Sequence, residues 1–219
     1  MNFLRRLFAP GPASLILLSL LAISMVFIRL RSTDSLRFIF LIWNLFLAWI
    51  PWAIAWWMTR RERPAWVLWL LGVLWLLFLP NAPYILTDLF HLRSRTGIPL
   101  WYDLVMIMAF AWSALAWGLF SIGRIQALLS ARVPKAWTAL FTPLAIFLSA
   151  YGVYLGRYGR WNSWDLLSSP DSLLRYALDP VADPDKYVNV WAFTLIFGGF
   201  IYLIYRSVFQ RPSNVPAGA

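Results

Sequence analysis

The chain has 219 residues, of which 61% are hydrophobic and 13% charged; it contains 19 Lys and Arg, 9 Asp and Glu, one His and no Cys. Soluble domains carry about a quarter charged residues, so this composition excludes an ordinary water-soluble globule, and it excludes a disordered chain as well. The lack of Cys excludes disulfide frameworks, zinc–thiolate sites and cysteine nucleophiles. The net charge of +10 lies in short loops between apolar segments, where lipid headgroups are a sufficient partner, so no nucleic-acid partner is expected.

Six long segments carry no charge; they cover residues 7–28, 38–59, 64–87, 104–123, 136–156 and 187–205. The hydrocarbon core of a bilayer, about 30 Å thick, needs roughly 20 apolar residues of α-helix to cross it. These segments also lack the polar face of a helix in a soluble protein. The sequence therefore predicts an all-α polytopic membrane protein, a single domain over residues 1–219 with transmembrane helices at 10–29, 38–58, 65–86, 103–123, 137–156 and 187–206.

Six spans place both termini and the loops after the second and fourth spans on one side of the membrane, face A. Face B holds the other loops, at residues 29–37, 88–103 and 157–186. Face A has ten basic residues and face B nine, which gives only a small bias under the positive-inside rule. Because Arg5 and Arg6 precede the first helix, we predict that face A and the termini are cytoplasmic. The sequence leaves the oligomeric state open.

The third charge-free segment contains Pro80, Asn81 and Pro83. Proline lacks an N–H donor and crowds the preceding turn, so the third helix is predicted to be kinked or broken at Pro80–Pro83. Irregular backbone at membrane depth is tolerated where it is buried in protein or lines a wet cavity, which favours a polar pocket. A new helical piece would then place Asp88 and His91 on one face. The alternative is that the helix simply ends here, with Asn81 as its cap.

The fifth segment ends in a polar stretch, residues 156–165, with the sequence Gly-Arg-Tyr-Gly-Arg-Trp-Asn-Ser-Trp-Asp. A continuing helix would place Arg157 and Arg160 on one face, and two guanidinium groups this close to a bilayer suit a phosphate or a carboxylate. We predict an anion-binding site of Arg157, Arg160 and Asn162. The alternative is that both arginines reach lipid phosphate or pair with Asp165.

Asp103 and Asp165 flank the fourth and fifth spans at face B, and we expect them to support the site. With Asp88 and His91 they form an oxygen-rich set, which suits Mg²⁺ or Mn²⁺ better than zinc. The sequence therefore allows a magnesium or manganese site. Ordinary ion pairing is the alternative, and Asp103 in a first helical turn is also a favourable cap.

Three segments carry a family resemblance: Phe78–His91, Trp101–Asp103 and Gly156–Asp165. With these motifs in order over about residues 66–197, the chain resembles a bacterial integral membrane protein family catalogued as domain of unknown function thirteen sixty-one. The resemblance implies a multi-pass protein of the bacterial inner membrane. It supplies no activity, substrate or catalytic residue.

The leading hypothesis is that a polar pocket at face B binds an anionic lipid or a polyprenyl-phosphate headgroup through Arg157 and Arg160. Asp88 and His91 are the candidate catalytic acid/base pair, so it stays open whether the protein is an enzyme that acts on this ligand. The alternatives are a small-solute or proton transporter or channel-like protein, and a structural membrane scaffold.

Overall fold

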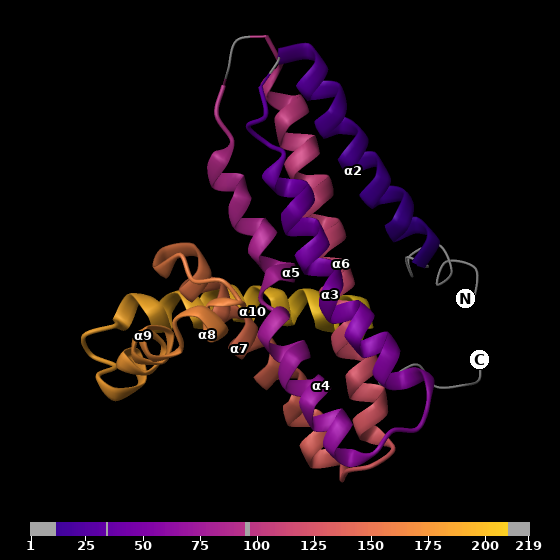
Figure 1. Ribbon diagram of the computed structural model, residues 1–219, viewed down its shortest axis with the longest axis vertical. Coiled ribbons are helices and arrows are strands. Elements are labelled where there is room, and N and C mark those ends of the chain that lie inside the picture. Colours follow the sequence, from indigo (N-terminus) through magenta and orange to yellow (C-terminus); the bar gives the residue numbers. More distant parts are fainter. Residues whose placement is uncertain (1–11, 34, 95–96, 210–219) are drawn as a thin grey trace, which may run out of the picture.

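The computed structural model describes residues 12–33, 35–94 and 97–209. They form α2 (Pro12–Thr33), α3 (Phe40–Arg60), α4 (Ala65–Phe78), α5 (Asn81–Tyr84), the 3₁₀ helix η1 (Ile85–His91), α6 (Leu100–Ser130), α7 (Lys135–Gly159), α8 (Asp165–Ser168), α9 (Pro170–Ala182) and α10 (Val188–Phe209) (Figure 1). Within these residues the fold is built from helices and contains no strand, which confirms the predicted all-α class.

Six helical stretches of the described chain are long and apolar enough to cross a membrane: Ala13–Thr33, Phe40–Arg60, Ala65–His91, Leu100–Ser130, Lys135–Gly159 and Val188–Phe209. Each overlaps one of the six predicted segments, and the protein therefore has the architecture of a multi-pass membrane protein. Positions 10 and 11 of the first predicted span, together with Arg5 and Arg6, lie outside the described residues.

Helix α6 is the centre of the molecule. It packs against α2, α3, α5, η1 and α7, and 78% of its most apolar window is buried, against 17–33% for the other five spans. At 31 residues it extends past residue 123, where the charge-free segment ends. There Arg124 donates from Nη1 to Thr59 Oγ1 of α3 at 3.2 Å.

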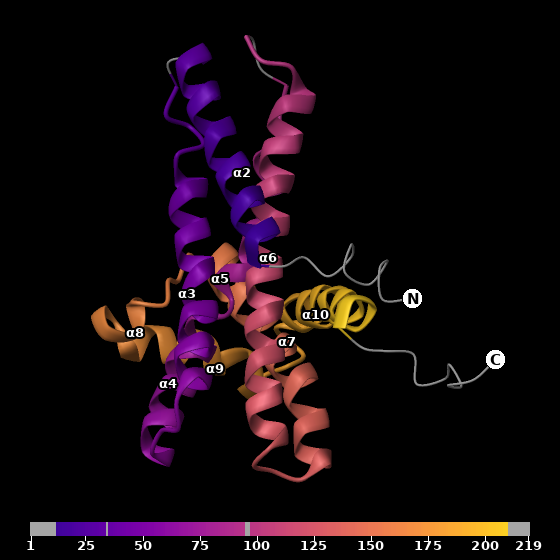
Figure 2. The same cartoon turned by 90° about the vertical axis from the view of Figure 1, so that its right-hand side faces the viewer.

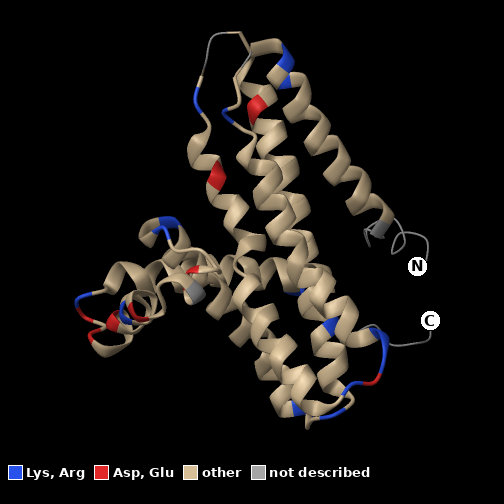
Figure 3. Ribbon diagram, in the orientation of Figure 1, with Lys and Arg blue, Asp and Glu red and all other residues tan. Residues whose placement is uncertain are grey.

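The outer helices present large apolar side chains outward. Trp69 is 75% exposed on α4, Ile196 is 75% exposed on α10, and Leu17 is 67% exposed on α2. Lys, Arg, Asp and Glu lie mainly in loops and near helix ends, with long uncharged stretches between them (Figure 3). Exposed apolar surface on this scale is stable against lipid and unfavourable in water.

The third span bends slightly where α4 ends at Phe78 and α5 begins at Asn81, which confirms the kink predicted at Pro80–Pro83; we call this point the helix break. An added Cβ at Gly152 of α7 would lie 2.5 Å from Cγ of Pro80, and one at Gly118 of α6 would lie 2.5 Å from Cβ of Ala82. These glycines let α6 and α7 approach the interrupted backbone closely. The irregular segment is therefore buried in protein, where a membrane tolerates it.

Helices α7 and α10 pack against each other, and α7 also packs against α6. The ring of Phe147 in α7 packs directly against Gly198 of α10. A Cβ added at Gly198 would lie only 2.6 Å from Cδ1 of that ring, so a larger residue does not fit there without a shift. Helix α10 lies crosswise to α6 in Figure 1 and is seen nearly end-on in Figure 2. The short helices α8 and α9 connect this pair at the end where α7 approaches η1.

Candidate functional site

Asp88 of η1 lies at the centre of a polar cluster that joins three spans. Its side chain is 2% exposed, and Arg157 of α7 donates from Nη1 to its Oδ1 at 3.3 Å. Asn44 of α3 donates from Nδ2 to the other carboxylate oxygen at 3.0 Å. His91, one turn further along η1, has Nδ1 3.8 Å from Oδ1 of Asp88. The structure thus brings together Asp88, His91 and Arg157 as predicted members of one site.

Asn44 was not predicted from the sequence. Its signal was present, because it is the only amide side chain between residues 38 and 59. A lone amide inside a charge-free membrane segment needs a hydrogen-bond partner, since lipid supplies none. That the partner is Asp88 depends on how α3 packs against η1, which the sequence pattern does not contain.

Arg157 occupies the last turn of α7, and its side chain is 15% exposed. Its guanidinium carbon lies 5.2 Å from the ring centroid of Phe90 and 5.9 Å from that of Tyr84, at distances typical of cation–π contacts. Asp88 is its only hydrogen-bond partner among the described residues, through one of five N–H donors. Arg157 therefore keeps donors that an incoming anion can use.

Side chains complete the hydrogen bonding of the backbone at the helix break. Asn81 donates from Nδ2 to the carbonyl oxygen of Phe78 at 2.9 Å and to Ser163 Oγ at 3.1 Å. Ser163 in turn donates to the carbonyl oxygen of Leu77 at 3.0 Å. Asn81 therefore binds the end of α4, as the capping interpretation predicted, while the break itself is buried. The loop after α7 is held against the break by the same contacts.

A cavity of about 400 Å³ lies at the break, between α3, α4, α5, α7, α8 and α9. Most of its lining is apolar, and no lining residue carries a charge. Its polar and aromatic lining residues are Trp43, Asn44, Asn81, Tyr84, Tyr151, Trp161, Asn162, Ser163 and Trp164. Asn44 lines this cavity and also donates a hydrogen bond to Asp88, so it connects the cavity to the Asp88 cluster.

The predicted helical continuation through Arg160 is wrong. Helix α7 ends at Gly159, and Arg160 is its C-cap in the left-handed conformation with φ 59°. Arg160 is exposed and does not share a helical face with Arg157. Asp165 accepts from the backbone N–H of Asn162 at 2.6 Å and from its Nδ2 at 3.4 Å, so its carboxylate orders this loop.

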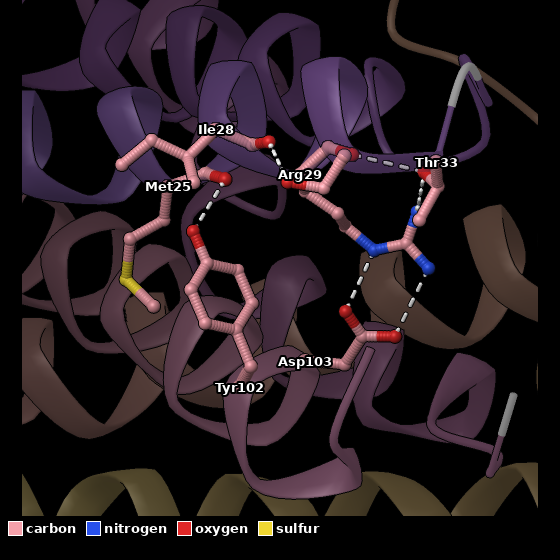
Figure 4. A network of polar contacts seen from close by, with 7 residues as sticks. Met25, Ile28, Arg29, Thr33, Tyr102 and Asp103 are labelled. Carbon is pink, nitrogen blue, oxygen red and sulfur yellow. Dashed lines mark hydrogen bonds and ion pairs between the residues drawn. The ribbon is translucent and has the colours of Figure 1, made fainter. Parts of the chain in front are cut away.

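Asp103 pairs with Arg29 of α2 and makes no hydrogen bond or ion pair with the Asp88 cluster among the described residues (Figure 4). Arg29 donates from Nε to Oδ1 at 2.7 Å and from Nη2 to Oδ2 at 3.1 Å, and both side chains are at most 4% exposed. Beside this pair, the hydroxyl of Tyr102 donates to the carbonyl oxygen of Met25 at 2.9 Å. These contacts fasten the end of α2 to the start of α6.

Arg29 was also missing from the predicted site residues. The signal was an arginine directly after the charge-free segment 7–28, together with an aspartate in the first turn of another span predicted to begin at the same membrane face. Within the described residues no group of three or more His, Asp or Glu side chains could hold a metal ion. The magnesium or manganese site therefore stays a prediction from the sequence, with Asp103 and Asp165 engaged by other partners here.

No curated protein and no solved structure gives a significant match to the chain. A family model does match: the family described as protein of unknown function (DUF1361), over residues 43–204. That range contains the helix break, the Asp88 cluster and the loop after α7, whereas α2 and Arg29 precede it. Since the match covers well over half of the chain, the protein belongs to the DUF1361 family.

Proposed function

We propose that the protein binds an amphiphilic ligand with an anionic headgroup, such as an anionic lipid or a polyprenyl phosphate, at face B. The observation that carries the proposal is the position of Arg157. Its guanidinium group is mostly enclosed and keeps unused donors. In the chain, Arg157 directly follows Gly156, which lines the cavity at the helix break. A guanidinium group binds phosphate through charge-assisted hydrogen bonds. Arg160 is the proposed second cation because it is exposed at the end of the same helix, although it does not share a helical face with Arg157.

The cavity suits the remainder of such a ligand. Ligand pockets commonly enclose 300–1,000 Å³ with mainly apolar walls and a few polar groups, and the cavity at the break fits this description. Membrane lipids are therefore the proposed partners. We further propose the bacterial inner membrane as the location, with cytoplasmic termini, and His91 beside Asp88 as the pair that would transfer protons if the bound ligand is transformed.

The test is equilibrium binding of a polyprenyl phosphate to the protein in lauryldimethylamine oxide, a detergent without phosphate or sugar, with the uncharged polyprenol as reference ligand. Loss of charge-assisted hydrogen bonds predicts that Arg157→Ala combined with Arg160→Ala raises Kd about tenfold or more. Arg206→Ala, which removes an exposed arginine at the end of α10, should leave Kd unchanged. Equal affinity of the double variant and the wild type contradicts the proposal.

A transporter is the second candidate, and the enclosed carboxylate of Asp88 favours it. Ionisable groups inside membrane spans commonly mark ion or solute paths, and discontinuous helices commonly form their binding sites. This function predicts substrate-dependent or proton flux into liposomes that Asp88→Asn abolishes. A scaffold without a ligand predicts neither flux nor lipid selectivity.

A further inference from the structure

Three asparagines line the cavity at the helix break, and each uses its amide NH₂ group within the protein. Asn44 donates to Asp88 at 3.0 Å, Asn162 donates to Asp165 at 3.4 Å, and Asn81 donates to a backbone carbonyl at 2.9 Å. In the part of the chain that the structure describes, no donor reaches the carbonyl oxygen of any of these three amides.

Chemistry fixes the orientation of these amides. Carboxylate and carbonyl oxygens only accept hydrogen bonds, so the NH₂ end of each amide faces the protein partner and the oxygen end is left for another donor. A phosphate diester has no proton to donate and gains nothing from such acceptors. A hydroxyl group donates its proton to an amide oxygen directly.

The aromatic lining adds donors and apolar ring faces. The indole nitrogens of Trp43, Trp161 and Trp164 have no acceptor among the described residues, and all three residues line the cavity. Hydroxyl groups both donate and accept, so they match a lining that offers amide acceptors and indole donors together. The apolar faces of the rings suit the C–H surface of a ring-shaped polyol.

We propose that this cavity binds the hydroxyl-bearing headgroup of a glycolipid, a sugar ring in the simplest case. This inference deepens the proposed function and rests on it for the anionic group: the sugar occupies the cavity, and a phosphate linked to it lies at Arg157. The cavity thus selects the ligand by its hydroxyl groups, and Arg157 selects it by charge.

A neutral lipid pair tests the sugar site separately from the anion site. Binding of monoglucosyl diacylglycerol and of plain diacylglycerol is measured in lauryldimethylamine oxide for the wild type, Asn162→Ala and Asn189→Ala. Asn162 is exposed at the cavity, and its backbone N–H keeps the contact with Asp165 after substitution. Asn189 is an exposed asparagine of α10 outside the cavity lining and is the matched control.

The wild type should bind the glucolipid about tenfold more tightly than diacylglycerol. Asn162→Ala should reduce this preference about threefold or more, the effect of one hydrogen bond, and Asn189→Ala should preserve it. Equal binding of the two neutral lipids by the wild type, or an unchanged preference in Asn162→Ala, overturns the sugar site. In the earlier test, equal polyprenyl-phosphate affinity of the wild type and of the Arg157→Ala, Arg160→Ala double variant, with the glucolipid preference intact, would overturn only the anion site.

Discussion

Asp103 and Asp88 are both enclosed aspartates near face B, and both pair with arginine. The two pairs differ in how many N–H donors of the arginine are left unused. Arg29 grips both oxygens of Asp103, and neither side chain is more than 4% exposed. Arg157 reaches one oxygen of Asp88 at 3.3 Å through one N–H and stays 15% exposed. The first pair is complete in itself and fastens two helices. The second has spare donors beside a cavity, which is the condition for binding a ligand.

The largest effect is expected at the complete pair. Arg29→Ala leaves the Asp103 carboxylate enclosed without a counter-charge, which costs about 3–5 kcal/mol of unfolding free energy. Sodium dodecyl sulfate titration in mixed micelles measures this cost. The double variant Arg29→Ala with Asp103→Ala should recover part of it, because no unpaired charge is left. A single variant as stable as the wild type would contradict a structural role for this pair.

A smaller effect is expected where the helix break is packed. Gly152→Ala places a Cβ 2.5 Å from Cγ of Pro80, so the unfolding free energy should fall by about 1–3 kcal/mol. Gly72→Ala on α4 is the matched control, since nothing lies within 4 Å of an added Cβ there. Its stability should be unchanged or higher, because alanine favours a helix over glycine. Equal losses of unfolding free energy in both variants would mean that the close contact with Pro80 does not add to the cost of Gly152→Ala.

The smallest stability effect is expected at the open pair. Asp88→Asn keeps the shape of the side chain and leaves Arg157 partly exposed, so the loss should be about 1 kcal/mol, well below that of Asp103→Asn. The same titration measures both variants side by side. Equal losses at the two positions would remove the distinction between a complete and an open pair.

Asp88→Asn should also change ligand binding. The Asp88 carboxylate competes with an anionic headgroup for Arg157, so its neutralisation should tighten polyprenyl-phosphate binding, by about fivefold. Equilibrium titration of the variant against the wild type measures the shift. Weaker binding in the variant would instead assign Asp88 to holding Arg157 in position.

Local patterns were sufficient to predict the fold and part of the site. Charge-free segments predicted six long helices, and Pro80 with Pro83 predicted the interruption, because bilayer thickness and the missing proline N–H act on the local chain. Asp88 and Arg157 were expected at the same membrane face from the parity of the spans. Their contact at 3.3 Å agrees with that expectation.

The remaining features depend on packing between spans or on a single backbone angle. The partners of Asn44 and Arg29 follow from which helix faces meet, and no local pattern in the sequence fixes those faces. Arg160 departs from the helix because its own backbone adopts the left-handed conformation that ends α7. From sequence, that conformation is expected of glycine or asparagine far more readily than of arginine.

Native mass spectrometry of the protein purified in lauryldimethylamine oxide tests the central claim, that Arg157 holds an anionic headgroup, most directly. The wild type and Arg206→Ala should both retain a bound phosphorylated lipid, and Arg157→Ala should lose it while staying folded. Retention of the same lipid at the same occupancy in all three proteins would contradict the claim.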